Sequence, residues 1–225
     1  MIRQARKAPR AAAIAGILFA VLFSTSMVLI RLSIPEELSG NIATWAQENT
    51  TTISLALTLM PFAGICFLWF IAVVRDHLGA LEDQFFSTIF LGGSILFLAM
   101  MFVSAAVAES ILISYSIAAH PLVQSGGILF GRALMYTITN VYAIRMAAVC
   151  MMALATIWMR TRIMPRWLVF PTYALAVLLL VSSRLTLWLI LVFPAWVFVI
   201  SIWILIVHLR HKLTEAEDIP GPNDS

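Results

Sequence analysis

Long, almost uncharged apolar runs restrict the fold of this sequence more than any other feature. Crossing ~30 Å of hydrocarbon takes about 20 helical residues at ~1.5 Å each. Several runs have this length, and the region 167–209 is long enough for two crossings separated near Arg184. The expected helices are 11–30, 51–74, 85–108, 134–159, 167–182 and 185–209.

Helices are the only secondary structure that suits these runs. In hydrocarbon every backbone amide and carbonyl must be hydrogen-bonded within the protein, and a barrel would need alternating strands that the sequence lacks. Only 11% of the residues are charged and 62% are hydrophobic, whereas soluble domains are roughly 25% charged. We therefore predict an all-α, polytopic transmembrane bundle of about six spanning helices. Its main partner is the lipid bilayer, and nucleic acid is not an expected partner.

The basic residues predict how the helices are oriented. Most of them fall at the N-terminus or in alternate connections, and few fall in the others, which is the bias expected when the first group is cytoplasmic. Both termini are then cytoplasmic: 1–10 is a basic N-terminal segment, 11–209 is the transmembrane domain, and 210–225 is a disordered tail. The first run lacks a small-x-small cleavage site, so we expect it to be retained. The cytoplasmic residues would be Arg3, Arg6, Lys7, Arg10, Arg75, Arg160, Arg162, Arg166, Arg210 and Lys212, against Arg31, Arg132 and Arg184 outside.

Arg145 is the residue that most needs an explanation. It lies near the middle of the run 134–159, where an arginine costs roughly 2.5–3.5 kcal/mol on insertion scales. Glu109, just after the third run, is the one acidic residue outside the loops, the tails and the edges of the runs. It is expected more than a helical turn higher than Arg145. An ion pair between them is one alternative, and contacts of Arg145 with hydroxyls, carbonyls or water are the other.

Polar side chains near Arg145 suggest a ligand site. Tyr142 precedes Arg145 on the same helical face, and Asn140 belongs to a polar patch with Tyr136 and Thr137. With Glu109, these residues could line an outward-facing hydrated cavity for a small polar or anionic ligand, in a binding or transport protein. The competing interpretation is that they are hydrogen-bonded only to neighbouring helices, in a structural or assembly partner of another membrane protein or in a homo-oligomer.

Motifs of common enzymes and cofactor sites are missing. The sequence has no Gly-x-Ser-x-Gly, His-Glu-x-x-His, P-loop, Gly-x-Gly-x-x-Gly or Cys-x-x-Cys pattern. We therefore predict no catalytic residue, metal ligand or cofactor, and a membrane enzyme ranks third among the hypotheses.

Two stretches around the second and third runs resemble a known group of proteins. One begins with Met60-Pro61-Phe62-Ala63-Gly64 and extends to Phe70, and the other contains Arg75-Asp76 and Glu82-Asp83-Gln84-Phe85-Phe86-Ser87-Thr88-Ile89-Phe90-Leu91-Gly92. In these stretches the chain resembles uncharacterised bacterial multi-helix inner-membrane proteins. The resemblance implies a multi-pass protein of the bacterial plasma membrane and implies no activity.

Overall fold

The computed structural model describes residues 8–33, 42–78, 84–117, 127–162, 164–181 and 187–217, and these form helices without any strand. α5, the π-helical turn η1 and α6 follow one another without a break and make one long helix, as do the 3-10 turn η2 and α8. The elements are α1 (Ala8–Ser33), α2 (Ile42–Leu78), α3 (Gln84–Ile117), α5 (Gly127–Thr137), η1 (Ile138–Ala143), α6 (Ile144–Thr161), α7 (Arg166–Val181), η2 (Leu187–Leu191) and α8 (Val192–Glu217).

The all-α class predicted from the apolar runs is confirmed, because each run coincides with one of six helices over its described residues. Five helices contain stretches long and apolar enough to cross a membrane: Arg10–Ile30, Thr50–Arg75, Gln84–Ile113, Leu129–Thr161 and Trp188–Arg210. α7 is apolar but has 16 residues, which span about 24 Å. α8 continues to Glu217, into the segment predicted as a disordered tail, because Leu, Lys, Ala and Glu prolong a helix.

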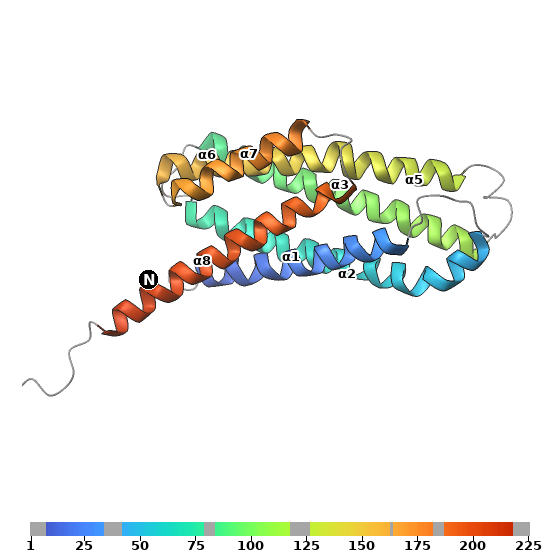
Figure 1. Cartoon of the computed structure of the whole chain (residues 1–225), viewed down its shortest axis with the longest axis horizontal. Helices are drawn as coiled ribbons and strands as arrows, with labels where there is room; N and C mark the ends of the chain where they lie inside the picture. The colour runs from blue at the N-terminus through green and yellow to red at the C-terminus, as the bar shows by residue number, and fades with distance from the viewer. Residues whose placement is uncertain are drawn as a thin grey trace, which may run out of the picture.

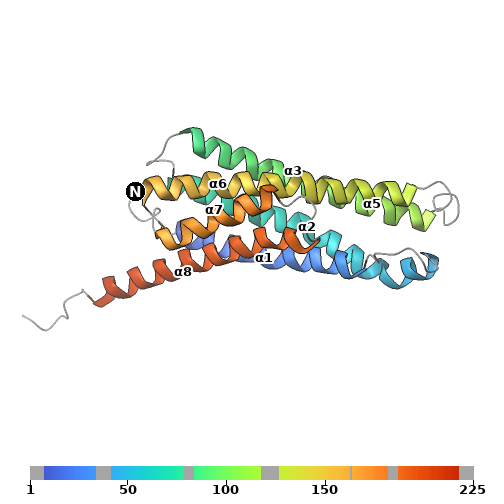
Figure 2. The same cartoon turned by 45° about the horizontal axis from the view of Figure 1, so that its top comes forward.

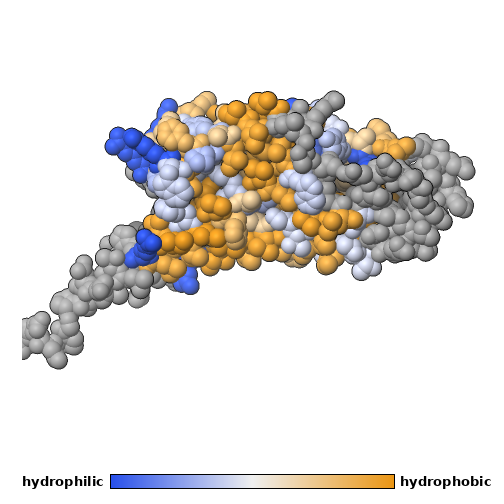
Figure 3. All heavy atoms as spheres, in the orientation of Figure 1, coloured by the Kyte–Doolittle hydropathy of each residue, from blue (hydrophilic) through white to orange (hydrophobic). Residues whose placement is uncertain are grey.

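The helices lie roughly side by side along one long axis (Figure 1). α1 packs against α2 and α8, while α6 packs against α3 and α7, and α2 joins the two groups through α3. The beginning of α1 and the end of α8 lie at the same end of the bundle in both views (Figures 1 and 2). At the opposite end, α2, α3 and α5 extend past the end of α1. Hydrophobic atoms cover the middle of the molecule, and hydrophilic atoms gather where α6 meets α7 (Figure 3).

Aromatic rings fill the centre of the bundle. Phe19 of α1 stacks on Phe67 of α2 with ring centroids 4.5 Å apart, and Phe97 of α3 meets Phe193 of α8 at 4.6 Å. Phe67 also meets Phe193 edge-on at 5.6 Å. All four rings are buried, so four separate helices share one apolar core. In a bilayer, where lipid is as apolar as the core, this close packing holds the helices together more than the hydrophobic effect does.

Small residues allow helix backbones to approach closely at two places. A Cβ on Gly16 of α1 would clash with the Ser201 hydroxyl of α8 and lie 2.8 Å from the Phe70 ring. A Cβ on Gly93 of α3 would lie 3.3 Å from the backbone nitrogen of Cys150 in α6. Of the small residues at 92–94, Gly93 and Ser94 therefore serve the packing of α3 on α6, whereas Gly92 faces open space.

Candidate functional site

The fourth helix departs from α-helical geometry at the polar patch. Residues 138–143 form a π-helical turn, in which the amide of Ile144 donates to the carbonyl of Thr139, five residues earlier. Such turns are uncommon inside α-helices and often occur at functional sites. This turn holds Thr139 and Asn140, and both side chains are buried.

Asn140 has a buried acceptor without a partner. Its side-chain nitrogen donates to the Tyr136 carbonyl oxygen at 3.1 Å, so the amide orientation is fixed, because only the nitrogen can donate. Among the described residues the side-chain oxygen Oδ1 is buried and has no hydrogen-bond partner. The whole side chain is 5% exposed. A buried polar atom left unpaired costs about 1–3 kcal/mol, so this oxygen is a strong candidate for contact with a ligand or an ordered water.

A hydroxyl pair lies beside Asn140 in the sequence and joins the π-helical turn to α3. Ser104 Oγ and Thr139 Oγ1 are 2.8 Å apart, and both residues are buried. One of the two hydroxyls donates to the other, which leaves the accepting hydroxyl with a proton for a further bond. Neither Ser104 nor Thr139 was among the site residues predicted from the sequence. Thr139 could have been predicted from its position between Thr137 and Asn140. Ser104 could not, because no sequence pattern indicates the rotation of α3 that turns it inward.

Three contacts set the register of α3 against the antiparallel fourth helix. Ser94 Oγ lies 3.1 Å from Cys150 Sγ, Ser104 bonds Thr139, and a Cβ on Gly131 would lie 2.8 Å from Ile111 Cδ1. Glu109 is therefore opposite residues 133–134. That is about 11 residues from Arg145, or about 16 Å at ~1.5 Å per residue. No ion pair between Glu109 and Arg145 is present, and the register explains why.

Arg145 is held by its own helix. Its Nη1 donates to the carbonyl oxygen of Val141 at 2.6 Å, which is the carbonyl alternative considered for this residue. The side chain is half-buried. Arg145 is about 22 Å along the helix from Arg160, so in a helix that enters a ~30 Å hydrocarbon layer at Arg160 it would lie in the far third of that layer rather than near its middle.

The same count locates the π-helical turn relative to the apolar stretches. If Arg75, Arg160 and Arg210 mark one boundary of a ~30 Å hydrocarbon layer, the other boundary falls about 20 residues away, near positions 55, 140 and 190. Asn140 and the Ser104–Thr139 pair would then lie close to that second boundary, and the parts of α2, α3 and α5 that extend past α1 would lie beyond it.

The four predicted site residues do not gather into one cluster. Asn140 points into the protein, whereas the Tyr142 side chain is 55% exposed and Glu109 is exposed on α3. Arg145 lies about 7 Å further along the helix than Asn140. The structure therefore reduces the candidate site to the π-helical turn and Ser104. Among the described residues, no group of three or more His, Cys, Asp or Glu side chains is placed to hold a metal ion.

Comparisons with known proteins add no family to this geometry. The chain matches no family model, no curated protein and no solved structure. The helices themselves define the class: this is a multi-pass membrane protein by the length and composition of its helices.

Proposed function

We propose that the protein binds a small neutral solute that donates hydrogen bonds, at a site reached from the outer side of the membrane. The observation that carries the proposal is the buried, unpaired Oδ1 of Asn140 in a π-helical turn. A ligand N–H or O–H would satisfy this oxygen, and the Ser104–Thr139 hydroxyls supply a second contact.

The charge of the surroundings favours a neutral ligand over an ion. An amide oxygen is an acceptor only, so it repels the acceptor oxygens of an anion. A cation would approach Arg145, one positive charge about 7 Å away along the helix, in a medium of low dielectric constant. Polyols and small amides donate hydrogen bonds and carry no charge. If the bound solute also leaves toward the cytoplasm, the protein is a transporter.

Orientation and location are part of the proposal. The basic residues support cytoplasmic termini and six crossings, with α7 as the shortest. The resemblance in the second and third helices supports the bacterial plasma membrane.

A structural or assembly role is the second candidate. Several polar side chains are fully used in bonds between helices: Ser26 donates to the Ala56 carbonyl at 2.6 Å, and Trp196 Nε1 donates to Thr172 at 3.0 Å. Thr156 and Tyr173 bond at 2.6 Å. Bonds of this kind stabilise a membrane bundle by about 0.6 kcal/mol each and need no ligand.

Thermal unfolding of the purified protein in nanodiscs tests the first candidate. Glycerol, erythritol, acetamide, sodium sulfate and ammonium chloride are added at millimolar concentration to wild type, Asn140→Leu and the matched control Thr156→Val. We expect the polyols or acetamide to raise Tm in wild type and the control only, since a ligand at 100 times its Kd stabilises by about 2.7 kcal/mol. Proteoliposome swelling in glycerol and acetamide then separates transport from binding. A panel without effect, or an equal effect in Asn140→Leu, contradicts the proposed site.

A further inference from the structure

α7 and α8 contact each other through tryptophan side chains. Trp167, the second residue of α7, lies edge-on to Trp203 of α8, with ring centroids 5.2 Å apart. Five residues further along α7, the Thr172 hydroxyl accepts a hydrogen bond of 3.0 Å from Trp196 Nε1, which lies seven residues earlier in α8. The two helices are therefore antiparallel. Beyond Trp203, α8 continues past the beginning of α7, as both views show (Figures 1 and 2).

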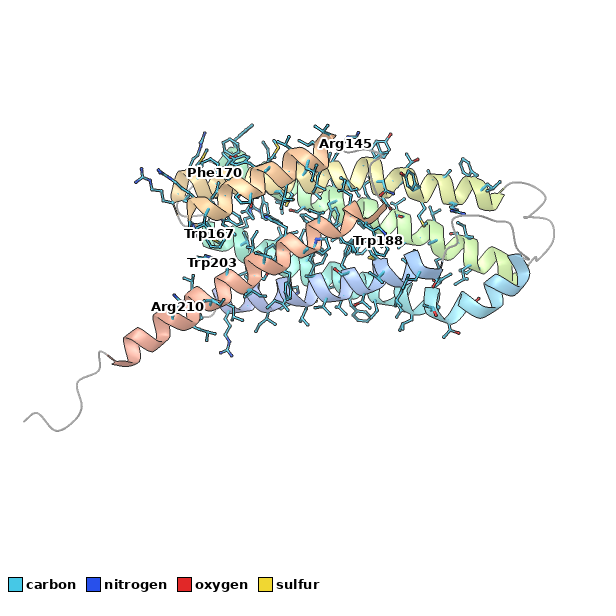
Figure 4. The ribbon with its side chains drawn as sticks, viewed as in Figure 1. Arg145, Trp167, Phe170, Trp188, Trp203 and Arg210 are labelled. Carbon is cyan, nitrogen blue, oxygen red and sulfur yellow. The ribbon has the colours of Figure 1, made fainter. Side chains whose placement is uncertain are left out.

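This continuation of α8 exposes apolar side chains that α7 does not cover. Trp203 is half-buried, whereas Ile206 and Val207, one turn further along, are exposed. Arg210 is exposed and follows Trp203 by seven residues, so it lies on the same side of α8 about 10 Å further along. Figure 4 shows Arg210 on the part of α8 that extends past Trp167. An exposed apolar turn of α8 therefore ends at a guanidinium group.

The beginning of α7 and the turn before it face this part of α8. Arg162 ends α6 and Arg166 begins α7, and both side chains are exposed. Trp167 and Phe170 follow, with 61% and 64% of their surface exposed. Figure 3 shows hydrophilic atoms at this turn beside hydrophobic ones. We call the following six residues the α7–α8 surface: Arg162, Arg166, Trp167, Phe170, Trp203 and Arg210.

Arg162 occupies a backbone conformation that glycine would adopt more readily. Its φ is 55°, in the left-handed region where glycine or asparagine commonly ends a helix. The amide of Arg162 donates to the Trp158 carbonyl at 3.0 Å, so the end of α6 fixes this conformation. A less favourable residue at such a position points to a use for its side chain, and what arginine adds here is a positive charge.

The helices that form the α7–α8 surface carry almost no negative charge. Residues 110–214 contain no Asp or Glu, and α8 has acidic residues only at its end, at Glu215 and Glu217. These two follow Arg210 by about 8–10 Å along the helix. The neighbouring Arg160 is not part of the surface, because its guanidinium lies over the Phe86 ring of α3, 4.6 Å from the centroid. Three arginines therefore give the α7–α8 surface a net positive charge next to exposed aromatic rings.

We propose that the α7–α8 surface binds an anionic phospholipid. The headgroup phosphate lies among the three arginines, and the acyl chains lie along Phe170, the two indole rings and the exposed turn of α8. These arginines stand at the end of the apolar stretches, where lipid headgroups begin, and tryptophan favours the same level. Basic surfaces between helices at this level attract anionic lipids. A zwitterionic lipid fits less well, because its ammonium group would approach three guanidinium groups.

Quenching of tryptophan fluorescence by lipids with dibrominated acyl chains measures which lipid contacts the protein. The full-length protein is reconstituted in phosphatidylcholine bilayers that contain increasing fractions of brominated phosphatidylglycerol or brominated phosphatidylcholine. Arg162→Gly, Arg166→Gln and Arg210→Gln each remove one charge from the α7–α8 surface. Arg75→Gln is the matched control: Arg75 is exposed at the same end of the bundle, but on α2, which packs against α1 and α3.

We expect phosphatidylglycerol to quench wild type and Arg75→Gln at a lower mole fraction than phosphatidylcholine does. Each substitution at the α7–α8 surface should reduce this preference roughly fivefold, as expected for one basic residue near an anionic headgroup. In Arg162→Gly the preference should fall while Tm in phosphatidylcholine stays equal or rises, because glycine suits a φ of 55°. Binding is then lost without loss of folding.

Three results would overturn the proposal. The first is equal quenching of wild type by the two lipids. The second is an equal loss of preference in Arg75→Gln and Arg166→Gln, which would mean that only the total charge at this end of the bundle matters. The third is excess quenching by phosphatidylglycerol that persists in a Trp167→Phe, Trp203→Phe double variant, since the lipid would then lie elsewhere. Asn140 lies toward the opposite end of the same helix, so failure of either site leaves the other untouched.

Discussion

Gly92 and Gly93 offer a matched pair of positions for testing how α3 packs on α6. A Cβ on Gly93 would lie 3.3 Å from Cys150 N and 3.4 Å from Met146 O, both backbone atoms that cannot rotate away. A Cβ on Gly92, the next residue, would meet nothing within 4 Å. The same substitution at these two neighbours therefore separates the effect of packing from that of removing a glycine.

Gly93→Leu is expected to destabilise the fold by about 3 kcal/mol. The side chain of Leu at residue 93 would occupy space now held by the α6 backbone. Overpacking of this kind lowers stability by about 1–3 kcal/mol or more. Moving α6 away also lengthens the 3.1 Å contact between Ser94 Oγ and Cys150 Sγ. Gly92→Leu is expected to change stability by less than about 1 kcal/mol, in the stabilising direction, because Leu favours a helix more than Gly does.

Reversible unfolding in mixed micelles of increasing SDS content, followed by tryptophan fluorescence, measures both variants. In a Cys66→Ala background, the rate at which maleimide labels Cys150 gives a local readout, because this thiol is 1% exposed in the native protein. Gly93→Leu should accelerate the labelling and Gly92→Leu should not. If both variants are equally stable and equally protected, the register of α3 against α6 described above is wrong.

Three further predictions test other contacts. Gly16→Ala should lower the free energy of unfolding by about 1–3 kcal/mol in SDS titration, because its Cβ would clash with the Ser201 hydroxyl. Adding Ser201→Ala removes that hydroxyl and should restore part of the loss. If the effects of the two substitutions on stability simply add, the contact is refuted. Asn140→Leu should raise Tm without ligand, because it removes an unpaired buried oxygen; a fall of several degrees would show that the oxygen is satisfied. Phe86→Leu should lower the free energy of unfolding by about 0.5–1 kcal/mol, because the Arg160 guanidinium lies 4.6 Å from the Phe86 ring. In an Arg160→Gln background the same substitution should lower it by less.

The membrane explains why the helices could be predicted from sequence. A crossing segment must be long, apolar and internally hydrogen-bonded, so its composition defines the element with little help from tertiary contacts. The region 167–209 was divided at Arg184, which lies outside the described residues; α7 ends at Val181 before it and η2 begins at Leu187 after it. Helix ends were less predictable: α2 begins at Ile42 and α3 ends at Ile117, because these parts continue beyond the apolar runs.

The candidate site was only partly predictable, because it depends on helix rotation and on one extra residue in a turn. Composition identified Asn140 as unusual, and the structure shows it buried. The π-helical turn at 138–143 shifts the phase of the residues after it, and no sequence pattern indicated the turn. Tyr142 and Arg145 lie together on one face, away from Asn140, which steps of two and five residues already place on another side of a regular α-helix. Glu109 was included for its charge alone, and the register of α3 places it opposite α5.

Impermeant-maleimide labelling of single cysteines in intact cells tests whether six helices cross the membrane. In a Cys66→Ala, Cys150→Ala background, one cysteine replaces Ala8, one replaces Glu217 and one replaces Ser110 at the exposed end of α3. With six crossings and cytoplasmic termini, we expect labelling from outside at 110 and protection at both 8 and 217 until the membrane is opened. Labelling of 217 from outside with protection of 8 would mean an odd number of crossings, with α7 failing to span, and would contradict the arrangement from which every depth was derived.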